Sequence, residues 1–203
     1  MAIIVVGGNS RSVGKTSVVA GLISALPEFN WTAFKITQYG HGICSLNGKQ
    51  CQCATDDHSW AITEEKDRSG DSDTSRFLVA GASRVWWVRT EQGHLQQGMA
   101  AVRERLSESE NAIIESNSIL NFLEPDLYLS VVDPGIPDFK VSALKFLDRA
   151  DAVLLHNGSN RIAAGTARVF TISPPQYLTG EIVNFLRSRV GSFTSSTRLR
   201  TSR

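Results

Sequence analysis

The 203-residue sequence contains no long hydrophobic run and no excess of charge of either sign. Its longest apolar stretches have the length of a β-strand, which is too short to cross a bilayer. Lysine and arginine total 21 and aspartate and glutamate total 20, so the formal net charge is +1. A nearly neutral chain has no general attraction to nucleic acid or to a membrane surface. We therefore expect neither as a partner.

The sequence is also poor in cysteine and lacks the features of a secretory leader. All three cysteines lie between Cys44 and Cys53, which is not the pattern of a secreted disulfide framework. Residues 1–6 carry no basic flank and run directly into a glycine-rich turn, which is typical of a first strand. These features favour a reducing, cytoplasmic compartment.

Strand-like apolar runs alternate with helical patterns along most of the chain. We expect strands at residues 2–6, 31–37, 84–88, 112–114, 127–132, 152–155 and 168–172, and helices at 15–26, 74–80, 95–106, 141–147 and 178–187. This alternation predicts an α/β fold with a mainly parallel sheet. Residues 1–190 then form one domain. Residues 191–203, rich in Ser, Thr and Arg, are expected to be a flexible tail, with a basic contact arm as the alternative.

A glycine-rich stretch between the first strand and the first helix carries the strongest motif. Its glycines permit a tight backbone path around a polyphosphate, Lys15 can reach the β- and γ-phosphates, and Thr16 can place its hydroxyl on Mg²⁺. A chance Gly-Lys-Thr is common on surfaces, but this one follows an apolar strand and opens an amphipathic helix. The predicted nucleotide-binding loop consists of Gly8, Asn9, Ser10, Arg11, Ser12, Val13, Gly14, Lys15, Thr16 and Ser17.

Two features of this region resemble dethiobiotin synthetase, a member of the P-loop class that also holds the signal-recognition and Min-type NTPases. Five residues, rather than the commoner four, separate Gly8 from Gly14, and the second strand ends in Lys35. Residues 73–82 and 113–115 are similar instead to the molybdopterin-guanine dinucleotide biosynthesis protein B family, a small GTP-binding group. The resemblance covers roughly the first 160 residues. It implies a three-layer P-loop NTPase sandwich.

The resemblance also implies a magnesium site and a contact to the nucleobase. Thr16, Asp73 and Glu115 match the metal side of the site in these relatives, and Asn157 matches an asparagine near the base. Independently, Glu115 ends a strand expected to be central, where α/β sheets place their sites, although a solvated strand end is the alternative. Asp73 is equally explained as a helix N-cap, in which case Asp71 could replace it.

Lys35 ends its strand beside the predicted nucleotide-binding loop, called the phosphate loop below. Its ammonium could neutralise a γ-phosphate or a substrate anion there. A surface lysine is the alternative. Together with Lys15 and Glu115 it forms the expected catalytic set. The sequence has no Asn-Lys-x-Asp motif for reading guanine, so ATP and GTP both remain open. The chain departs from its relatives at residues 116–117, where a glycine would be expected, and this leaves the substrate open.

Residues 38–72 interrupt the alternation with a segment rich in Cys, His, Asp and Gly that has no clear period. Metal binding would order a loop that has so few apolar residues. An iron–sulfur cluster and free thiols are the alternatives, and one histidine could instead face the substrate. The predicted Zn²⁺ ligands are Cys44, Cys51, Cys53 and His58, with His41 as the competing fourth ligand.

These features predict a P-loop NTPase that binds ATP or GTP with Mg²⁺ and hydrolyses it or transfers its γ-phosphoryl group. The leading hypothesis is an accessory NTPase in cofactor or metal biosynthesis, as residues 73–82 and the cysteines suggest. An ATP-dependent carboxylate-activating ligase, suggested by the loop length, and a nucleotide-binding module without turnover are the alternatives. Besides the nucleotide, the partner is an unknown small molecule or protein, and a homodimer remains open.

Overall fold

The structure is a computed structural model that describes residues 1–39, 60–136, 139–157 and 167–200. An eight-stranded sheet in the order β3-β4-β2-β5-β1-β6-β7-β8 forms its middle layer. The strands are β1 (Ile3–Gly8), β2 (Trp31–Tyr39), β3 (Trp60–Glu64), β4 (Arg84–Glu91), β5 (Asn111–Glu115), β6 (Leu127–Val132), β7 (Ala152–His156) and β8 (Arg168–Ile172). Neighbouring strands pair in parallel, except that the edge strand β3 runs antiparallel to β4.

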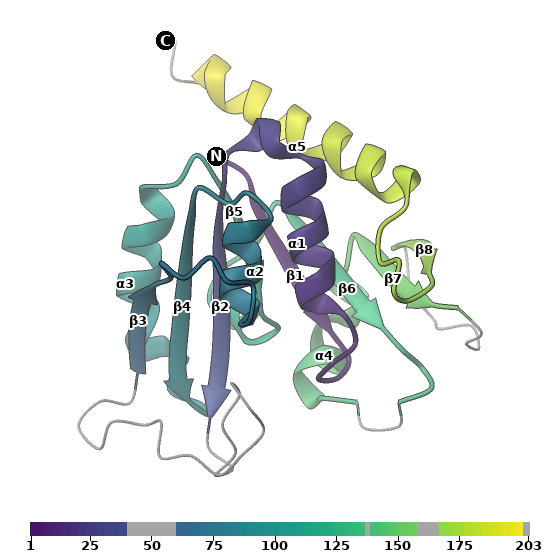
Figure 1. The fold of residues 1–203 in the computed structure, drawn as a ribbon, viewed down its shortest axis with the longest axis horizontal. Coiled ribbons are helices and arrows are strands. Elements are labelled where there is room, and N and C mark those ends of the chain that lie inside the picture. The colour runs from purple at the N-terminus through teal and green to yellow at the C-terminus, as the bar shows by residue number, and fades with distance from the viewer. Residues whose placement is uncertain (40–59, 137–138, 158–166, 201–203) are drawn as a thin grey trace.

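Helices cover both faces of this sheet, so the fold has three layers (Figure 1). The helices are α1 (Lys15–Ala25), α2 (Asp73–Val79), α3 (Leu95–Ser107), α4 (Val141–Phe146) and α5 (Gly180–Arg200), and short 3-10 turns lie at Pro27–Phe29, Ser118–Asn121 and Leu147–Arg149. Helices α1, α2 and α5 share one buried cluster with the sheet, and α3 and α4 share a second on the opposite face. The α/β fold with a mainly parallel sheet is confirmed.

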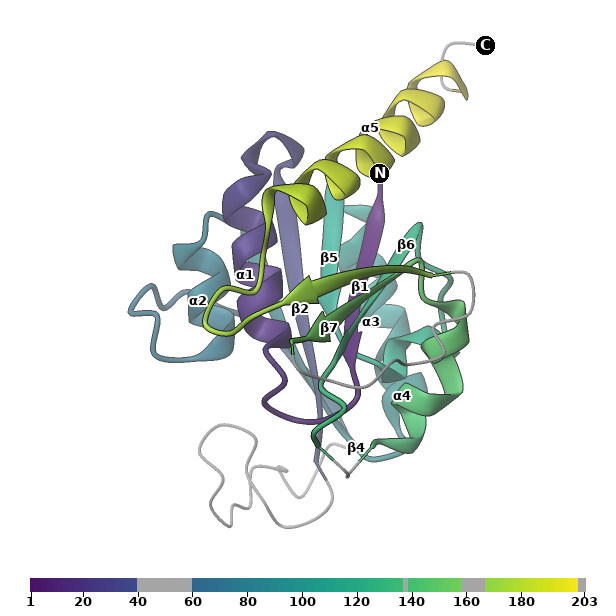
Figure 2. The same ribbon diagram turned by 90° about the vertical axis from the view of Figure 1, so that its right-hand side faces the viewer.

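The central strands β1 and β5 are buried along nearly their whole length, which explains their uninterrupted apolar sequences. β5 lies between β1 and β2, and its register places Glu115 opposite both Val6 and Lys35. The carboxyl ends of the parallel strands meet at the lower edge of the sheet in Figure 1. Ligands of α/β proteins bind at this edge. Helix α5 lies at the opposite edge, near the N-terminus (Figure 2).

The prediction that residues 38–72 lack regular structure is wrong for residues 60–64, which form β3. This strand pairs with β4, and its Trp60 ring lies against Gly98 of α3, 3.3 Å from the position of an added Cβ. Its Ile62 packs on the second cluster. Five residues are too few for their alternation to stand out in a polar segment, and their stability comes from partners distant in sequence.

Helix α5 also differs from the expectation, because it runs to Arg200 and includes the first ten residues of the expected tail. Ile182, Leu186 and Val190 are fully buried and hold the preceding turns on α1. Extending a helix that is already formed needs no new nucleus. Gly191 therefore does not end the helix, although glycine costs about 1 kcal/mol inside one.

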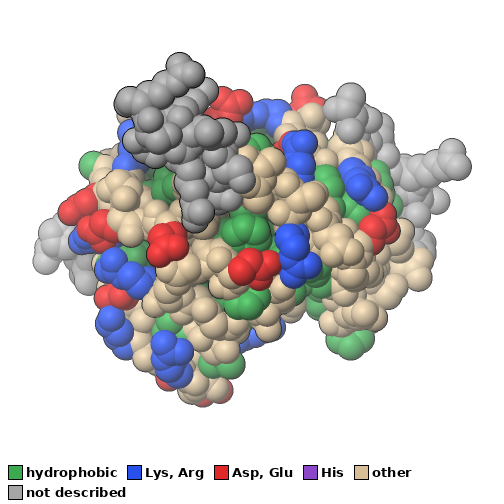
Figure 3. All heavy atoms as spheres, turned by 90° about the horizontal axis from the view of Figure 1, so that it is seen from above, with side chains coloured by type: hydrophobic (Ala, Val, Ile, Leu, Met, Phe, Trp, Pro, Cys, Tyr) green, Lys and Arg blue, Asp and Glu red, His purple; other side chains and the backbone are tan. Residues whose placement is uncertain are grey.

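The surface over the amino-terminal edge of the strands carries positive and negative side chains side by side (Figure 3). No large area of one sign is visible among the described residues on this face, in keeping with the balanced composition. None of the described helices combines the length and apolar character that a bilayer span requires.

Candidate active site at the phosphate loop

The loop from β1 into α1 has the backbone that its glycines predict. Ser12 (φ +53°) and Gly14 (φ +94°) both adopt left-handed conformations. A Cβ at Gly14 would lie 2.0 Å from Cε1 of Tyr177, so conformation and contact both require glycine there. Helix α1 starts with neither a side-chain cap nor an acidic residue in its first turn. Its first N–H groups and positive dipole end thus remain available to an anion.

Two asparagine side chains hold the start of the loop against the neighbouring strands. Asn9 is buried, and its amide both donates to the carbonyl of Asp133 (2.9 Å) and accepts from the Asp133 N–H (3.0 Å). Asn117 binds Gly8 in the same two-bond manner, at 2.8 and 2.9 Å. The sequence marked Asn117 only as a departure from a family pattern. Its role was missed because the partner lies 109 residues away.

Lys15 folds back over the loop, and its Nζ donates to the carbonyl of Ser10 at 2.5 Å. Burial lowers the pKa of Lys15 to about 8; Glu115 opposes this shift, and the cations Lys140 and Lys35 add to it. An anion that binds here stabilises the charged form of Lys15, because this ammonium is poorly solvated and lies beside other cations.

The three residues predicted to bind magnesium converge on one nitrogen, Nζ of Lys35. This atom lies 2.5 Å from Asp73 Oδ2, 2.7 Å from Glu115 Oε1 and 3.3 Å from Thr16 Oγ1. Thr16 also donates its hydroxyl to Glu115 Oε2 at 2.9 Å. Glu115 is 5% exposed, so its carboxylate is an almost fully buried charge. The four side chains come from α1, β2, α2 and β5.

The charge of Lys35 is fixed by its two carboxylate partners. Burial alone would lower the pKa of Lys35, but Glu115 and Asp73 outweigh it through charge and hydrogen bonds and hold the pKa above its usual value. The site therefore already holds one cation among two carboxylates and a hydroxyl. These are the oxygen donors that Mg²⁺ prefers. The residues present fit a magnesium ion.

Asp73 is not the N-cap of α2, as the sequence had allowed. Ser72 is the cap, because its Oγ accepts from the N–H of Ser75 at 3.0 Å. Asp73 is the first helical residue, and its carboxylate is directed at Lys35. Asp71 is exposed and its N–H donates to Ser69. The geometry therefore favours Asp73 over Asp71 as the metal-side carboxylate.

The segments that follow β7 and β8 lie on one side of the phosphate loop. His156 Nε2 donates to the carbonyl of Val13 at 2.9 Å, and the Tyr177 ring stands edge-on to His156 with centroids 6.1 Å apart. Asn157, the predicted base contact, donates its N–H to the carbonyl of Ile172 at the end of β8. His156 and Tyr177 carried no motif, and only the folded chain brings them to the loop.

The remaining members of the predicted loop have different environments. Ser17 accepts a hydrogen bond from Arg76 of α2 at 3.2 Å. Val13 is buried, whereas Arg11 is exposed.

The predicted zinc ligands, Cys44, Cys51, Cys53, His58 and His41, all lie outside the described residues. Within the described part of the chain, no group of three or more His, Cys, Asp or Glu side chains is arranged to hold a metal ion. The zinc site thus stays a prediction.

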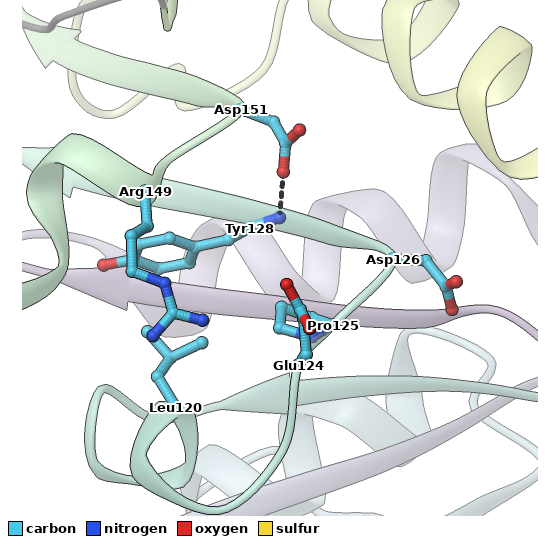
Figure 4. A pocket seen from close by; sticks show the side chains of 7 residues that line it. All are labelled: Leu120, Glu124, Pro125, Asp126, Tyr128, Arg149 and Asp151. Carbon is cyan, nitrogen blue, oxygen red and sulfur yellow. Dashed lines mark hydrogen bonds between the residues drawn. The ribbon is translucent and has the colours of Figure 1, made fainter.

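A cavity of about 290 Å³ lies at the other end of the sheet, where β6 and β7 begin (Figure 4). Its two aspartates serve the backbone: Asp126 accepts from the N–H of Ile3, and Asp151 from the N–H of Tyr128, each at 2.8 Å. These bonds secure strand ends far along β1 from the phosphate loop. We assign this cavity no chemistry.

No protein-family model and no curated protein matches the chain. Among solved structures, it is similar to "apo" form LpxK from Aquifex aeolicus in complex with ATP, with a TM-score of 0.50 and 21% identity over 84% of this chain and 53% of LpxK. The chain thus spans about half the length of that protein. It is also similar to HypB from Helicobacter pylori in complex with nickel, with a TM-score of 0.48 and 12% identity over 96% of this chain and 87% of HypB.

At sequence identities of 21% and 12%, similarity to these structures concerns the fold alone. The likeness to LpxK supports the α/β fold with a mainly parallel sheet, while the resemblance to dethiobiotin synthetase or to the molybdopterin-guanine dinucleotide family is not confirmed.

Proposed function

We propose that this protein binds a Mg²⁺–nucleoside triphosphate at residues 8–17 and hydrolyses it or transfers its γ-phosphoryl group. The observation that carries the proposal is the convergence of Thr16, Asp73 and Glu115 on one cation position beside the phosphate loop. Glu115 is buried and Asp73 is partly exposed, and neither carboxylate has an evident packing role. A cation held between them suits a reaction in which negative charge on phosphate oxygens must be stabilised.

Each residue has a distinct task in this proposal. The N–H groups at the start of α1 and the ammonium of Lys15 bind the phosphates. Mg²⁺, when held by Thr16, Asp73 and Glu115, supplies the charge that neutralises the β- and γ-oxygens. Lys35, whose ammonium now pairs with Asp73 and Glu115, would donate to the γ-phosphoryl group. Asn157, whose N–H binds the Ile172 carbonyl at the end of β8, is the residue proposed to contact the base.

We further propose an accessory role in cofactor or metal biosynthesis, supported by the sequence of residues 73–82 and by the cysteine-rich segment. An accessory NTPase should show slow basal turnover that a protein partner raises. A carboxylate ligase should turn over only with its small substrate, and a binding module should not turn over at all.

Calorimetric titration of Mg²⁺–ATP and Mg²⁺–GTP, followed by phosphate-release assays, tests the nucleotide proposal. We expect saturable binding of at least one nucleotide to the parent protein and none to Lys15→Ala. That variant should keep its far-UV circular dichroism, because Lys15 contributes a cation and little packing. Equal affinity of the parent and the variant would refute the assignment of the phosphate site.

A further inference from the structure

A groove of about 320 Å³ opens at the same edge of the sheet as the phosphate loop, but on the face covered by α3 and α4. Its polar side chains come from the end of β2, the turn after β4, the 3-10 turn after β5 and the start of α4. They are Gln38, Gln92, Ser118, Asn121 and Ser142, with the ring of Phe122 beside them. We call this the amide groove.

None of the described residues that line the amide groove has a charged side chain. Carboxamides and hydroxyls both donate and accept hydrogen bonds, so such a surface matches a ligand with the same dual capacity. An anionic ligand would lose its hydration there, and Lys145, which binds Asn121 Oδ1, is exposed and would compensate this loss only weakly. Phe122 adds an apolar surface suited to the C–H face of a ring.

Much of the hydrogen-bonding capacity of the groove is unused by the protein. Ser118 and Asn121 are engaged, since Asn121 accepts from Lys145 at 2.6 Å and Ser118 Oγ lies 3.0 Å from Ser116 Oγ. The side chains of Gln38, Gln92 and Ser142 have no hydrogen-bond partner among the described residues. Gln38 and Ser142 are half-buried, so they are polar groups that a ligand can satisfy, whereas Gln92 is exposed at the rim of the groove.

The groove shares its wall with the nucleotide site. Gln38 lies three residues beyond Lys35 on β2, and Ser118 lies three residues beyond Glu115. Three residues of strand span about 10 Å, and an odd spacing puts Gln38 and Lys35 on opposite faces. Within residues 115–118, Glu115 belongs to the nucleotide site, Asn117 is hydrogen-bonded to Gly8, and Ser118 lines the groove. A ligand in the groove would contact the segment that positions the phosphate loop.

We propose that the amide groove binds an uncharged, polyhydroxylated small molecule, of the class of neutral sugars and polyols, as the second ligand beside the nucleotide. The proposal rests on the proposed function for the identity of the neighbouring ligand, but the groove's own chemistry stands without it. The chemistry of the groove disfavours a ligand that would place a carboxylate there.

The test is ¹⁵N-detected NMR of the side-chain amides, with glucose, N-acetylglucosamine and glycerol as neutral probes and citrate and glucose 6-phosphate as anionic ones. We expect at least one neutral probe to shift the Gln38, Gln92 and Asn121 amides saturably, while Asn30, at the opposite edge, stays unchanged. Gln92→Ala should weaken this binding about fivefold, the effect of one lost hydrogen bond. Gln96→Ala, exposed on α3 outside the groove, is the matched control.

Absence of a shift with all three neutral probes, or tighter binding of the anionic probes, would overturn the proposal. The backbone N–H signals of Gly14 and Lys15 report on nucleotide binding in the same spectra. If nucleotides leave those signals unchanged while neutral probes shift the groove amides, the proposed function fails and the groove proposal stands.

Discussion

Glu115 is nearly buried, and its charge is balanced by an ammonium that reaches it from the neighbouring strand. Neither partner can be removed alone without leaving an unpaired charge in a poorly solvated place. The same arrangement means that a second cation and Lys35 compete for the oxygens of Glu115 and Asp73. Mg²⁺ held by these oxygens would weaken the contacts of Lys35, because the two cations would repel each other at such distances.

Lys35→Met tests this exchange of cations. The variant should lose about 2 kcal/mol of stability, less than for a fully buried pair because Asp73 is 44% exposed. Millimolar MgCl₂ should raise the melting temperature of the variant clearly more than that of the parent, since the ion now fills the vacated position. Thermal unfolding with and without MgCl₂ measures both effects.

Lys66→Met is the matched control, because Lys66 pairs with Glu64 at the surface and is 75% exposed. It should change stability little and gain nothing from Mg²⁺. An equal magnesium response in Lys35→Met and the parent would show that the three oxygens do not form a cation site.

The lowered pKa of Lys15 predicts how nucleotide affinity depends on pH. Below about pH 8 the lysine of the free protein is already an ammonium, and above it the lysine must take up a proton before it can bind phosphate. Affinity should therefore fall by up to about tenfold per pH unit above pH 8. Calorimetry between pH 7 and pH 9.5 measures this slope, over a range in which the triphosphate stays fully ionised.

Lys15→Arg provides the control, because its guanidinium stays charged throughout this range. Its affinity should be nearly independent of pH. If the nucleotide affinity of Lys15→Arg falls with pH as steeply as that of the parent, the titrating group is not Lys15.

At the scale of single elements, the phosphate loop depends on what packs around it. Gly14 and Gly81 both have positive φ, at +94° and +106°, but Gly14 faces the ring of Tyr177 whereas an added Cβ at Gly81 meets nothing within 4 Å. Alanine should cost each position about 1 kcal/mol of backbone strain. Gly14→Ala should in addition displace Tyr177 or the loop and reduce nucleotide affinity by at least about tenfold.

Parallel calorimetry of Gly14→Ala and Gly81→Ala separates the contact from the strain. Comparable nucleotide affinity in the two variants would mean that Tyr177 does not support the loop.

The sequence predicted those elements whose pattern is local. The apolar strand, glycine turn and amphipathic helix around Lys15 follow one another in the chain, and Lys35 and Glu115 were each expected at the carboxyl end of a strand. Edge strand β3, the hydrogen bonds of Asn117 to Gly8 and the amide groove were not predictable in this way. Each depends on partners that are brought close only by strand order, which single-sequence patterns do not encode.

At the scale of the whole molecule, the carboxyl edge of the sheet gathers every feature with a proposed function. The strand order puts β5 between the strands that carry the phosphate loop and Lys35. The cysteine-rich segment also starts and ends there: β2 ends at Tyr39, and β3 starts at Trp60, which pairs with Thr90 near the end of β4.

We expect about one Zn²⁺ per chain, held by Cys44, Cys51, Cys53 and either His58 or His41. Elemental analysis of protein purified without chelator measures the content. Cys51→Ser/Cys53→Ser should lose the metal and lower the melting temperature, because metal binding supplies folding energy to a segment with few apolar residues. Nucleotide binding should persist, since Lys15 and Glu115 belong to other elements, and Ser45→Ala should match the parent throughout. Metal-free parent protein with three rapidly reacting thiols and full activity would contradict the prediction, and brown, iron-containing protein would indicate an iron–sulfur cluster instead.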